Sequence, residues 1–587
     1  MTKQEVKQSK IAFLFVMIGI GFLIFLGALF YWSLIDRKIP SLTYKKVVQA
    51  TRGNIVSLDN FKVATSKKLY KAAVNTRYID PDKLDIFINL FSIYSGINKK
   101  TIKQKLLSKK GSLVLSYRID SRTAMHLKML AGKLMNLEVF IPKKNTKTGL
   151  FYTHGLSITE SGEKRVYPIK GTLIPVVGYT KKIDKNGITK VKGVKGIERY
   201  YEDKLISVQN SILQGKKDLG NYILLDRNSK SSLRIDGLDA HITISLKLQK
   251  MIEEVLDRHK KELDAKEIVV IVMHSSSGAI LSLATSNRYN PDNIRKVDYP
   301  NLNLTAIEYA YEPGSVMKPI IFSLLLEAKK VNPYDLVRMY GGKYKLGRRT
   351  ISDTHYDKEW ISAENVIVHS SNVGIAQLAQ KLDPTEYYQG LHKFGFTKKT
   401  DIDLPYEHKG RIPRLYKFKS MTYKASVSYG YGMLATFMQV VKAYNVFNNN
   451  GRIVTPYIVS YFQDSTGLKY PTIREPIKEV VPISVAKRMK DILIKTVQEG
   501  TGKKARVDGL IIGGKTGTAQ ISENRAYVRK YNSSFVGFAN DDKNRFTIGV
   551  LVVQPKKKYH YFASSSAVPV FRDVVLRLKE ESFLTPE

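Results

Sequence analysis

The stretch YEPGSVMKPI, residues 311–320, places Ser315 three residues before Lys318 and follows the lysine with Pro319. In an α-helix, residues three apart lie on one face, a single turn apart. A proline deep in a helix costs about 3 kcal/mol, but near the first turn its missing N–H costs little. We therefore predict a helix that begins near Gly314 or Ser315, with the serine at the positive end of the helix dipole. Such a pair can be a nucleophile and its base, although a capping serine and a surface lysine fit the same segment.

Two further triplets support the catalytic interpretation. HSSNVG contains Ser370, a hydroxyl that can relay a proton, and Asn372, an amide that can hold a peptide group. GGKTGTAQ follows the apolar run GLIIGG and supplies Lys515, Thr516, Gly517 and Thr518. On a strand, the lysine would lie beside the nucleophile, the glycine would let a substrate approach the backbone, and the threonines could bind a carboxylate.

Each triplet also occurs a second time. The SxxK spacing recurs at Ser484 and Lys487, SxN at Ser522 and Asn524, and KTG at residues 147–149. Only the first set follows the order SxxK, SxN, KTG with an apolar strand before the last triplet. The order of the three triplets is therefore the specific signal, and each triplet alone is weak.

Composition limits the remaining possibilities. The 587 residues predict two or three domains, and a net charge of +43 favours polyanions: nucleic acid, anionic lipid head groups or acidic wall polymers. The basic residues are scattered as solvated pairs without a zinc finger or basic-aromatic motif, so we expect no nucleic-acid partner. The absence of cysteine excludes disulfides, thiolate zinc sites and a cysteine nucleophile. The sequence predicts no cofactor and no metal.

The N-terminus carries an apolar segment, IAFLFVMIGIGFLIFLGALFYW, residues 11–32. Its 22 uncharged residues are long enough to cross a bilayer core of about 30 Å. It ends in interfacial aromatics and lacks a small-residue cleavage site, so we predict an uncleaved single-span anchor. Lysines and arginines flank both ends, and the basic-residue count therefore does not decide its orientation.

The rest of the chain predicts mixed secondary structure. Strand-like pieces at 69–75 and 172–180 and a helix-like piece at 84–96 precede a polar segment, and we place the main boundary at about 235–245. Beyond it we expect the following elements: a helix at 246–259, a β-hairpin at 267–286, a helix within 428–451 and a final helix at 567–581. A sheet that opens and closes this region, with helices between, predicts an α/β or α+β domain.

These residues resemble the penicillin-binding proteins and serine β-lactamases. VVIVMHSSSGAILSLAT, SYGYGMLATF, GTGKKARV, SSFVGFAN and AVPVFRD look like the transpeptidase domain of a class B penicillin-binding protein. TRGNI, RVYPIKGTLIPVVGYT and GVKGIERYYEDKL resemble the N-terminal pedestal of that class, and EPGSVMKP is most similar to its division-specific members. One departure is YFASSSAVPVF, where the family often has two glycines. The implied domains are a cytoplasmic tail at 1–10, an anchor at 11–32, a mixed α+β pedestal of dimerisation type at 33–240, a transpeptidase domain at 241–580 and a tail at 581–587.

The resemblance implies a mechanism. Neutral Lys318 would deprotonate Ser315, which attacks the penultimate D-Ala carbonyl of a peptidoglycan stem peptide. The backbone N–H groups of Ser315 and Thr518 would form the oxyanion hole, and Ser370 would pass a proton to the leaving D-Ala. An amine from a neighbouring strand would then form the cross-link, and β-lactams would acylate the same serine.

The resemblance also implies the binding residues and partners. Lys515, Thr516 and Thr518 would bind the terminal carboxylate, and Asn372 would hold the donor peptide and Lys318. The substrate lies outside the cytoplasm, so the N-terminus should be cytoplasmic, in contact with inner-membrane lipid. A glycan polymerase of the FtsW type and other division proteins are the implied partners.

Three alternatives remain open. An elongation-specific class B transpeptidase would keep the same site. A membrane-bound β-lactamase or β-lactam sensor would not need the large pedestal-like region. A non-catalytic scaffold of the division complex predicts that the serine is dispensable.

Overall fold

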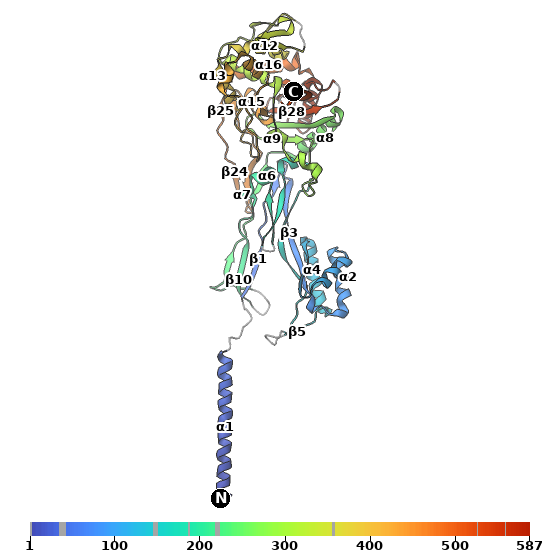
Figure 1. Ribbon diagram of the computed structural model, residues 1–587, viewed down its shortest axis with the longest axis vertical. Helices are drawn as coiled ribbons and strands as arrows, with labels where there is room; N and C mark the ends of the chain where they lie inside the picture. Colours follow the sequence, from blue (N-terminus) through green and yellow to red (C-terminus); the bar gives the residue numbers. More distant parts are fainter. Residues whose placement is uncertain are drawn as a thin grey trace. The chain divides into compact units, whose positions relative to one another are not determined.

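The computed structural model describes most of the chain as two compact units (Figure 1). One unit comprises residues 1–48 and 210–234, and the other comprises residues 49–209 and 235–587. The described residues are 3–34, 43–144, 151–185, 188–217, 223–354, 358–524, 526–557 and 559–586.

The smaller unit holds the apolar segment. Helix α1 (Lys3–Leu34) contains a stretch from Gln8 to Leu34 that is long and apolar enough to cross a membrane. The helix therefore extends further on both sides than the predicted segment 11–32, because no proline breaks it. The unit also contains a small sheet, with β10 (Ser211–Lys217) between β1 (Thr43–Val48) on one side and β11 (Ile223–Leu224) and β12 (Lys230–Ser232) on the other.

In the larger unit, the region before residue 240 is built on a mixed nine-stranded sheet. Its strand order is β24-β23-β13-β2-β3-β7-β9-β8, with β4 paired to β3. The strands are β2 (Ile55–Val56), β3 (Lys62–Asn75), β4 (Ser112–Ile119), β7 (Ser157–Val166), β8 (Thr180–Lys185), β9 (Ile188–Gly193), β13 (Asp239–Ile242), β23 (Val459–Gln463) and β24 (Lys469–Pro471). Helices α2 (Leu84–Ser95), α3 (Lys99–Ser108) and α4 (Ser121–Asn136) pack with β3 and β4 around a small core, as Figure 1 shows for α2 and α4.

The sheet continues across the predicted boundary at 240. Strand β13 pairs with β2 from the N-terminal side and with β23 from the C-terminal side. The hydroxyl of Tyr201 also donates to the buried Asp403 carboxylate at 3.1 Å, and that carboxylate accepts the N–H groups of Ile458 and Val459. The two regions therefore share strands and buried polar contacts.

The predicted strand-like piece at 172–180 is wrong for most of its length. Residues Ile174–Val177 form a helical turn, α5, and only Thr180 belongs to a strand. Pro175 sits in the first turn, and Gly178 ends it with a φ of +82°. A short apolar run fits either a strand or a buried turn, and periodicity alone does not separate the two.

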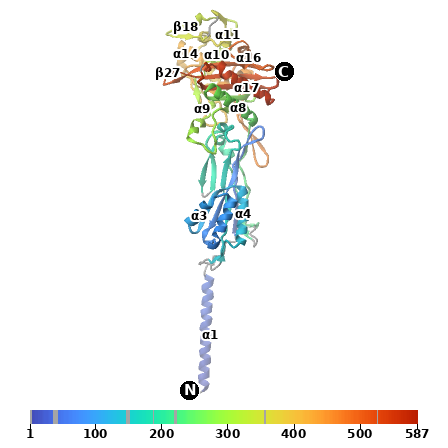
Figure 2. The same ribbon diagram turned by 90° about the vertical axis from the view of Figure 1, so that its right-hand side faces the viewer.

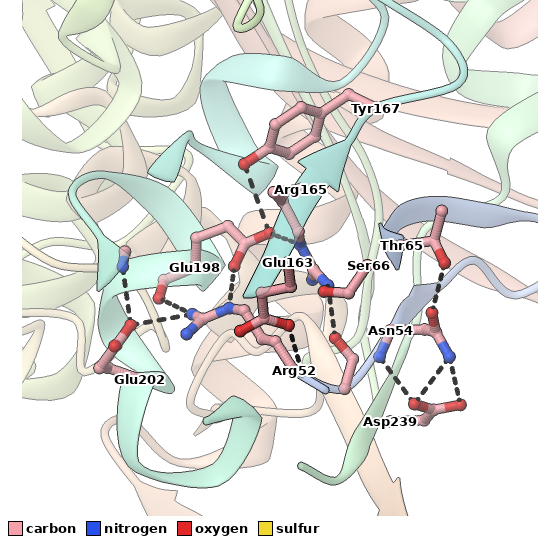
Figure 3. Close-up of polar contacts among 12 residues, drawn as sticks. Arg52, Asn54, Thr65, Ser66, Glu163, Arg165, Tyr167, Glu198, Glu202 and Asp239 are labelled. Carbon is pink, nitrogen blue, oxygen red and sulfur yellow. Dashed lines mark hydrogen bonds and ion pairs between the residues drawn. The ribbon is translucent and has the colours of Figure 1, made fainter. Parts of the chain in front are cut away.

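A buried ion-pair cluster joins strand β7 to the segments that carry Arg52 and Glu198 (Figure 3). The Glu198 carboxylate accepts from Arg52 at 2.8 Å and from Arg165 at 2.6 Å, and all three side chains are at most 1% exposed. Arg52 also pairs with Glu202, and its backbone N–H donates to Glu163. Burial alone would raise the pKa of Glu198, but the two guanidinium groups hold it below its ordinary value. The cluster joins segments that are far apart in sequence, and breaking it would leave a buried charge unpaired.

The C-terminal region surrounds an antiparallel five-stranded sheet in the order β15-β14-β28-β27-β26. The strands are β14 (Ala265–His274), β15 (Ile280–Thr285), β26 (Ile511–Glu523), β27 (Ala526–Asn540) and β28 (Arg545–Pro555). The predicted hairpin is the β14–β15 pair, and β26 is an edge strand.

Helices cover both faces of this sheet, as its almost wholly buried central strands require (Figure 2). Helices α8 (Leu246–Leu263) and α17 (Ala567–Glu580) pack on one face, and α10 (Lys318–Glu327), α15 (Phe437–Asn448) and α16 (Ile483–Gln498) lie on the other. The other helices are α9 (Thr305–Glu308), α11 (Ala363–Val368), α12 (Asn372–Leu378), α13 (Pro384–Lys393) and α14 (Met421–Ser428). The mixed α+β class is as expected.

The helix predicted within 428–451 begins later than the quoted stretch. Residues before Phe437 include Gly430 and Gly432 with φ of +81° and +76°, and the short strand β21 (Ala435–Thr436). Thr436 then caps α15 in a capping box with Gln439.

Candidate active site

Ser315 lies in the tight turn that starts a helix. Gly314–Met317 form a 3₁₀ turn that leads directly into α10, so the predicted helix start is confirmed. Pro319 falls in the first turn of α10, where no intrahelical bond is lost. The hydroxyl of the buried Tyr444 donates to the Val316 carbonyl at 2.7 Å and holds the turn against α15.

Lys318 is fully buried beneath the turn. Its Nζ donates to the backbone carbonyl of Ser370 at 2.5 Å and to the Ser370 hydroxyl at 3.2 Å. Burial lowers the pKa of Lys318 to about 7, and the negative charge of Asp353 opposes that shift. A large share of this lysine is therefore neutral near pH 7 and can accept a proton.

The SxN segment is held by a carboxylate from elsewhere in the chain. Asp353 accepts from the Ser371 hydroxyl at 2.6 Å and from the backbone N–H groups of Asn372 and Val373, at the N-terminus of α12. Ser370 itself has a φ of +62°, a left-handed conformation that is uncommon outside glycine. The Asn372 amide donates to the Ser352 carbonyl at 3.1 Å.

The KTGT segment forms the middle of the edge strand β26. Lys515 is fully buried, and its Nζ contacts the carbonyl and the hydroxyl of Thr516, both at 3.2 Å. Burial, with the charge of the nearby Lys318, lowers the pKa of Lys515 well below its ordinary value. The Thr516 hydroxyl is 2.7 Å from that of Thr501, and the Thr518 hydroxyl accepts the N–H of Ala563 at 3.1 Å.

Gly517 brings the strand against the turn that carries Ser315. A Cβ atom at this position would lie 2.7 Å from the Ser534 hydroxyl and 2.9 Å from Val316. The missing side chain lets β26 pack on the serine turn. The predicted approach of a substrate to the backbone at this glycine stays a prediction.

The predicted residues converge on one cleft of about 260 Å³. Its lining residues are Ser315, Asp353, Thr354, His369, Ser370, Ser371, Asn372, Thr501, Thr516, Thr518, Phe562, Ala563 and Ser564. Lys318 and Lys515 lie beneath it, bonded to Ser370 and Thr516.

The repeated triplets are placed differently. Ser484 and Lys487 are exposed on α16, Ser522 is exposed near the end of β26, and Asn524 is exposed just after that strand. Residues 147–149 lie outside the described residues.

Sequence reasoning missed several residues of the cleft. No sequence pattern marks Asp353 as a site residue, because its carboxylate binds backbone N–H groups at the N-terminus of a helix that begins 19 positions later. Thr501 lies in the quoted GTGKK stretch, and Phe562 to Ser564 lie in the stretch where the chain departs from the family pattern.

Comparison with known proteins identifies the family. Residues 268–576 match the family described as Penicillin binding protein transpeptidase domain, and residues 47–239 match Penicillin-binding Protein dimerisation domain. The chain belongs to the penicillin-binding proteins. The prediction of a class B penicillin-binding protein, of its fold and of a transpeptidase enzyme is thereby confirmed.

Several penicillin-binding proteins are similar over much of this chain. The "Probable peptidoglycan D,D-transpeptidase PenA" of Neisseria flavescens is 28% identical over 65% of this chain and 93% of its own length. The "Peptidoglycan D,D-transpeptidase FtsI" of Buchnera aphidicola is 26% identical over 100% of this chain and 97% of its own. The crystal structure of Penicillin Binding Protein 2X from Streptococcus thermophilus has a TM-score of 0.74 at 21% identity, covering 93% of this chain and 83% of that one. That likeness shows the shared fold.

Proposed function

We propose that this penicillin-binding protein is a membrane-anchored peptidoglycan D,D-transpeptidase that cross-links stem peptides during septal wall synthesis. The observation that supports it most is the convergence of three separate triplets on one cleft above two fully buried lysines. A buried lysine whose pKa is about 7 has the property that a general base needs at neutral pH.

Acylation starts at Ser315. Neutral Lys318 takes the hydroxyl proton, and Ser315 attacks the penultimate D-Ala carbonyl of the donor stem peptide. The backbone N–H groups of Ser315 and Thr518 stabilise the oxyanion, as the position of the serine in a helix-starting turn favours. Ser370, whose hydroxyl accepts a hydrogen bond from the Lys318 amine, delivers a proton to the departing D-Ala nitrogen.

Substrate binding uses β26 and the SxN segment. Lys515, Thr516 and Thr518 bind the terminal carboxylate, and Asn372 holds the donor peptide. A bound carboxylate opposes the lowering of the Lys515 pKa that burial causes, and it favours the charged amine.

An amine of a neighbouring strand then attacks the acyl-enzyme and releases Ser315, and β-lactams acylate the same hydroxyl. The proposed reaction uses no cofactor or metal. The N-terminus lies in the cytoplasm and the catalytic region on the outer side, with α1 in the membrane lipid. An FtsW-type glycan polymerase and other division proteins are the proposed partners.

Covalent labelling by a fluorescent penicillin tests the site. Ser315→Ala in the full-length, detergent-solubilised protein should abolish labelling, whereas Ser484→Ala, the matched change at the exposed repeat of the motif, should leave it intact. Labelling that survives Ser315→Ala would refute the assignment. Loss of labelling in both variants would point to unfolding, which a melting curve separates from loss of the nucleophile.

Depletion of the protein in cells tests the septal role. The relative named FtsI, similar over the whole chain, supports division rather than elongation. Filaments are expected on depletion, and a copy carrying Ser315→Ala should fail to restore septation. Round cells would favour the elongation role, and full rescue by Ser315→Ala would favour a scaffold.

A further inference from the structure

A carboxylate lies three residues before the proposed nucleophile and takes no part in the cleft described above. Glu312 follows the short strand β16 (Ala310–Tyr311). Its Oε1 accepts the N–H of Gly432 at 2.8 Å and the hydroxyl of Tyr527 at 3.3 Å. Its Oε2 is shielded from solvent and has no hydrogen-bond partner among the described residues. An unpaired buried carboxylate oxygen is costly, and its retention beside a catalytic turn calls for a functional reason.

Three tyrosines lie near this carboxylate, and the hydroxyl of Tyr527 contacts it directly. Tyr431 and Tyr527 contact each other edge to face, with ring centroids 5.5 Å apart. The hydroxyl of Tyr423 donates to the carbonyl of Gly432, the residue whose N–H holds Glu312. Burial, together with the charge of Glu312, raises the pKa of the Tyr431 and Tyr527 phenols, so both lie within its electrostatic reach. A carboxylate with aromatic rings beside it has the chemistry that binds an ammonium group.

The tyrosine cluster is tied to both parts of the site that handle substrate. The N–H of Gly314, next to Ser315, donates to the Gly430 carbonyl at 3.2 Å. The hydroxyl of Tyr431 accepts the N–H of Gln520 at 3.0 Å. Gln520 lies two residues beyond Thr518 on β26, which is about 7 Å along a strand. A peptide that follows β26 past Thr518 therefore reaches the cluster within one or two residues of its scissile bond.

We propose that Glu312, with the rings of Tyr431 and Tyr527, forms a subsite for a side-chain ammonium group of a peptidoglycan stem peptide. The proposal rests on the transpeptidase function proposed above. The Tyr527 side chain is 51% exposed, and its hydroxyl takes the place of the ammonium donor at Oε1 in the empty site. A donor stem peptide keeps its side-chain ammonium group throughout the reaction, whereas an acceptor amine must leave Glu312 and lose its proton before it attacks the acyl-enzyme. Either strand can therefore supply the ligand at its own stage of the reaction.

Paired substrates distinguish these two sources. The donor arm follows exchange of the terminal D-Ala of a soluble pentapeptide for a D-amino acid, with the side-chain amine of the pentapeptide either free or acetylated. The acceptor arm follows dimer formation between an acetylated donor and an amine-bearing acceptor, and measures KM for that acceptor. Both arms use the full-length protein in detergent. A ratio between two substrates on one enzyme cancels any general loss of activity.

In the donor arm, the ratio of turnover of the free amine to turnover of the acetylated peptide should be about tenfold higher for the wild type than for Glu312→Gln. In the acceptor arm, the KM of the wild type for the acceptor should instead be about tenfold lower than that of Glu312→Gln. The arm in which Glu312→Gln removes the effect identifies the strand. Glu523→Gln, which alters an exposed carboxylate of the same hairpin paired with Lys530, should leave both ratios unchanged. Tyr527→Phe removes the competing hydroxyl but keeps the ring, so it should lower KM for the amine-bearing substrate.

The proposal is overturned if Glu312→Gln keeps the wild-type ratio in the donor arm and the wild-type KM in the acceptor arm. It is also overturned if Tyr527→Phe and Glu312→Gln reduce turnover of free and acetylated peptides equally, because that result describes a purely structural carboxylate. Failure of the proposed function would look different. In that case the wild type would neither bind penicillin nor turn over the unmodified pentapeptide.

Discussion

The proposed base titrates near neutral pH, so the rate of acylation should depend on pH in a specific way. Burial lowers the pKa of Lys318 to about 7, and only the neutral amine can take the proton of Ser315. The neutral fraction is about 1% at pH 5 and about 99% at pH 9, so the second-order rate constant for a fluorescent penicillin should rise about a hundredfold, with its midpoint near pH 7. Stopped-flow labelling of the full-length protein measures that curve.

A charge-neutral variant of Asp353 should move this midpoint. The carboxylate raises the pKa of Lys318 against the effect of burial, so Asp353→Asn should lower that pKa and shift the curve to lower pH. A neighbouring opposite charge moves a pKa by about one unit or more, which would raise the neutral fraction at pH 6 from about 10% to about 50%. The plateau rate should also fall, because Asp353 anchors the backbone of Asn372.

The midpoint and the plateau are measured independently from one pH curve. A lower plateau caused by a displaced Asn372 therefore does not hide a shift of the midpoint caused by the lost charge of Asp353. A rate that is constant between pH 5 and pH 9, or a midpoint near the ordinary lysine value, would refute Lys318 as a base of lowered pKa. A midpoint that moves to higher pH in Asp353→Asn would refute the electrostatic reasoning.

Three other substitutions test the fold around the site. Gly517→Ala should reduce penicillin labelling at least tenfold, because the new methyl group forces β26 away from the serine turn. The control is Gly132→Ala, at a helical glycine with open space around it. This change should leave the stability of the protein unaltered in a melting experiment or raise it by up to about 1 kcal/mol. Tyr444→Phe removes the hydrogen bond to the Val316 carbonyl and should lower the free energy of unfolding in urea by about 0.5–1.5 kcal/mol; an unchanged midpoint would contradict the role given to its hydroxyl. Glu198→Gln should cost about 3–5 kcal/mol, against less than about 1 kcal/mol for Glu523→Gln at an exposed pair, and similar costs for the two would contradict the importance of burial.

The sequence predicted the elements whose signals are local. The proline after Lys318 located the start of α10, the apolar run before Lys515 located β26, and the Ser-Gly turn located the β14–β15 hairpin. The order of the triplets separated Ser315 from Ser484, and burial separates them again in the structure.

The missed features depend on contacts between distant segments. Asp353 contacts Asn372 through space, and no periodicity marks such a contact in advance. A side chain at position 517 would collide with Val316, about 200 positions earlier in the chain. This constraint can be recognised only once β26 and the serine turn are packed together. The sequence predicts a strand where Ile174–Val177 form a helical turn, because four apolar residues carry too little periodicity to separate the two.

The nine-stranded sheet has a consequence for how this chain can be exchanged with its relatives. A chimaera joined at residue 240 would take β2 from one parent and β23 from the other, with β13 at the seam between them. The hydrogen bond from Tyr201 to Asp403 would then also unite two parental sequences. Mismatched partners there leave strand edges open to aggregation. Recombinants should therefore survive best when both sides of the sheet are inherited together, even though they lie more than 200 positions apart in the gene product.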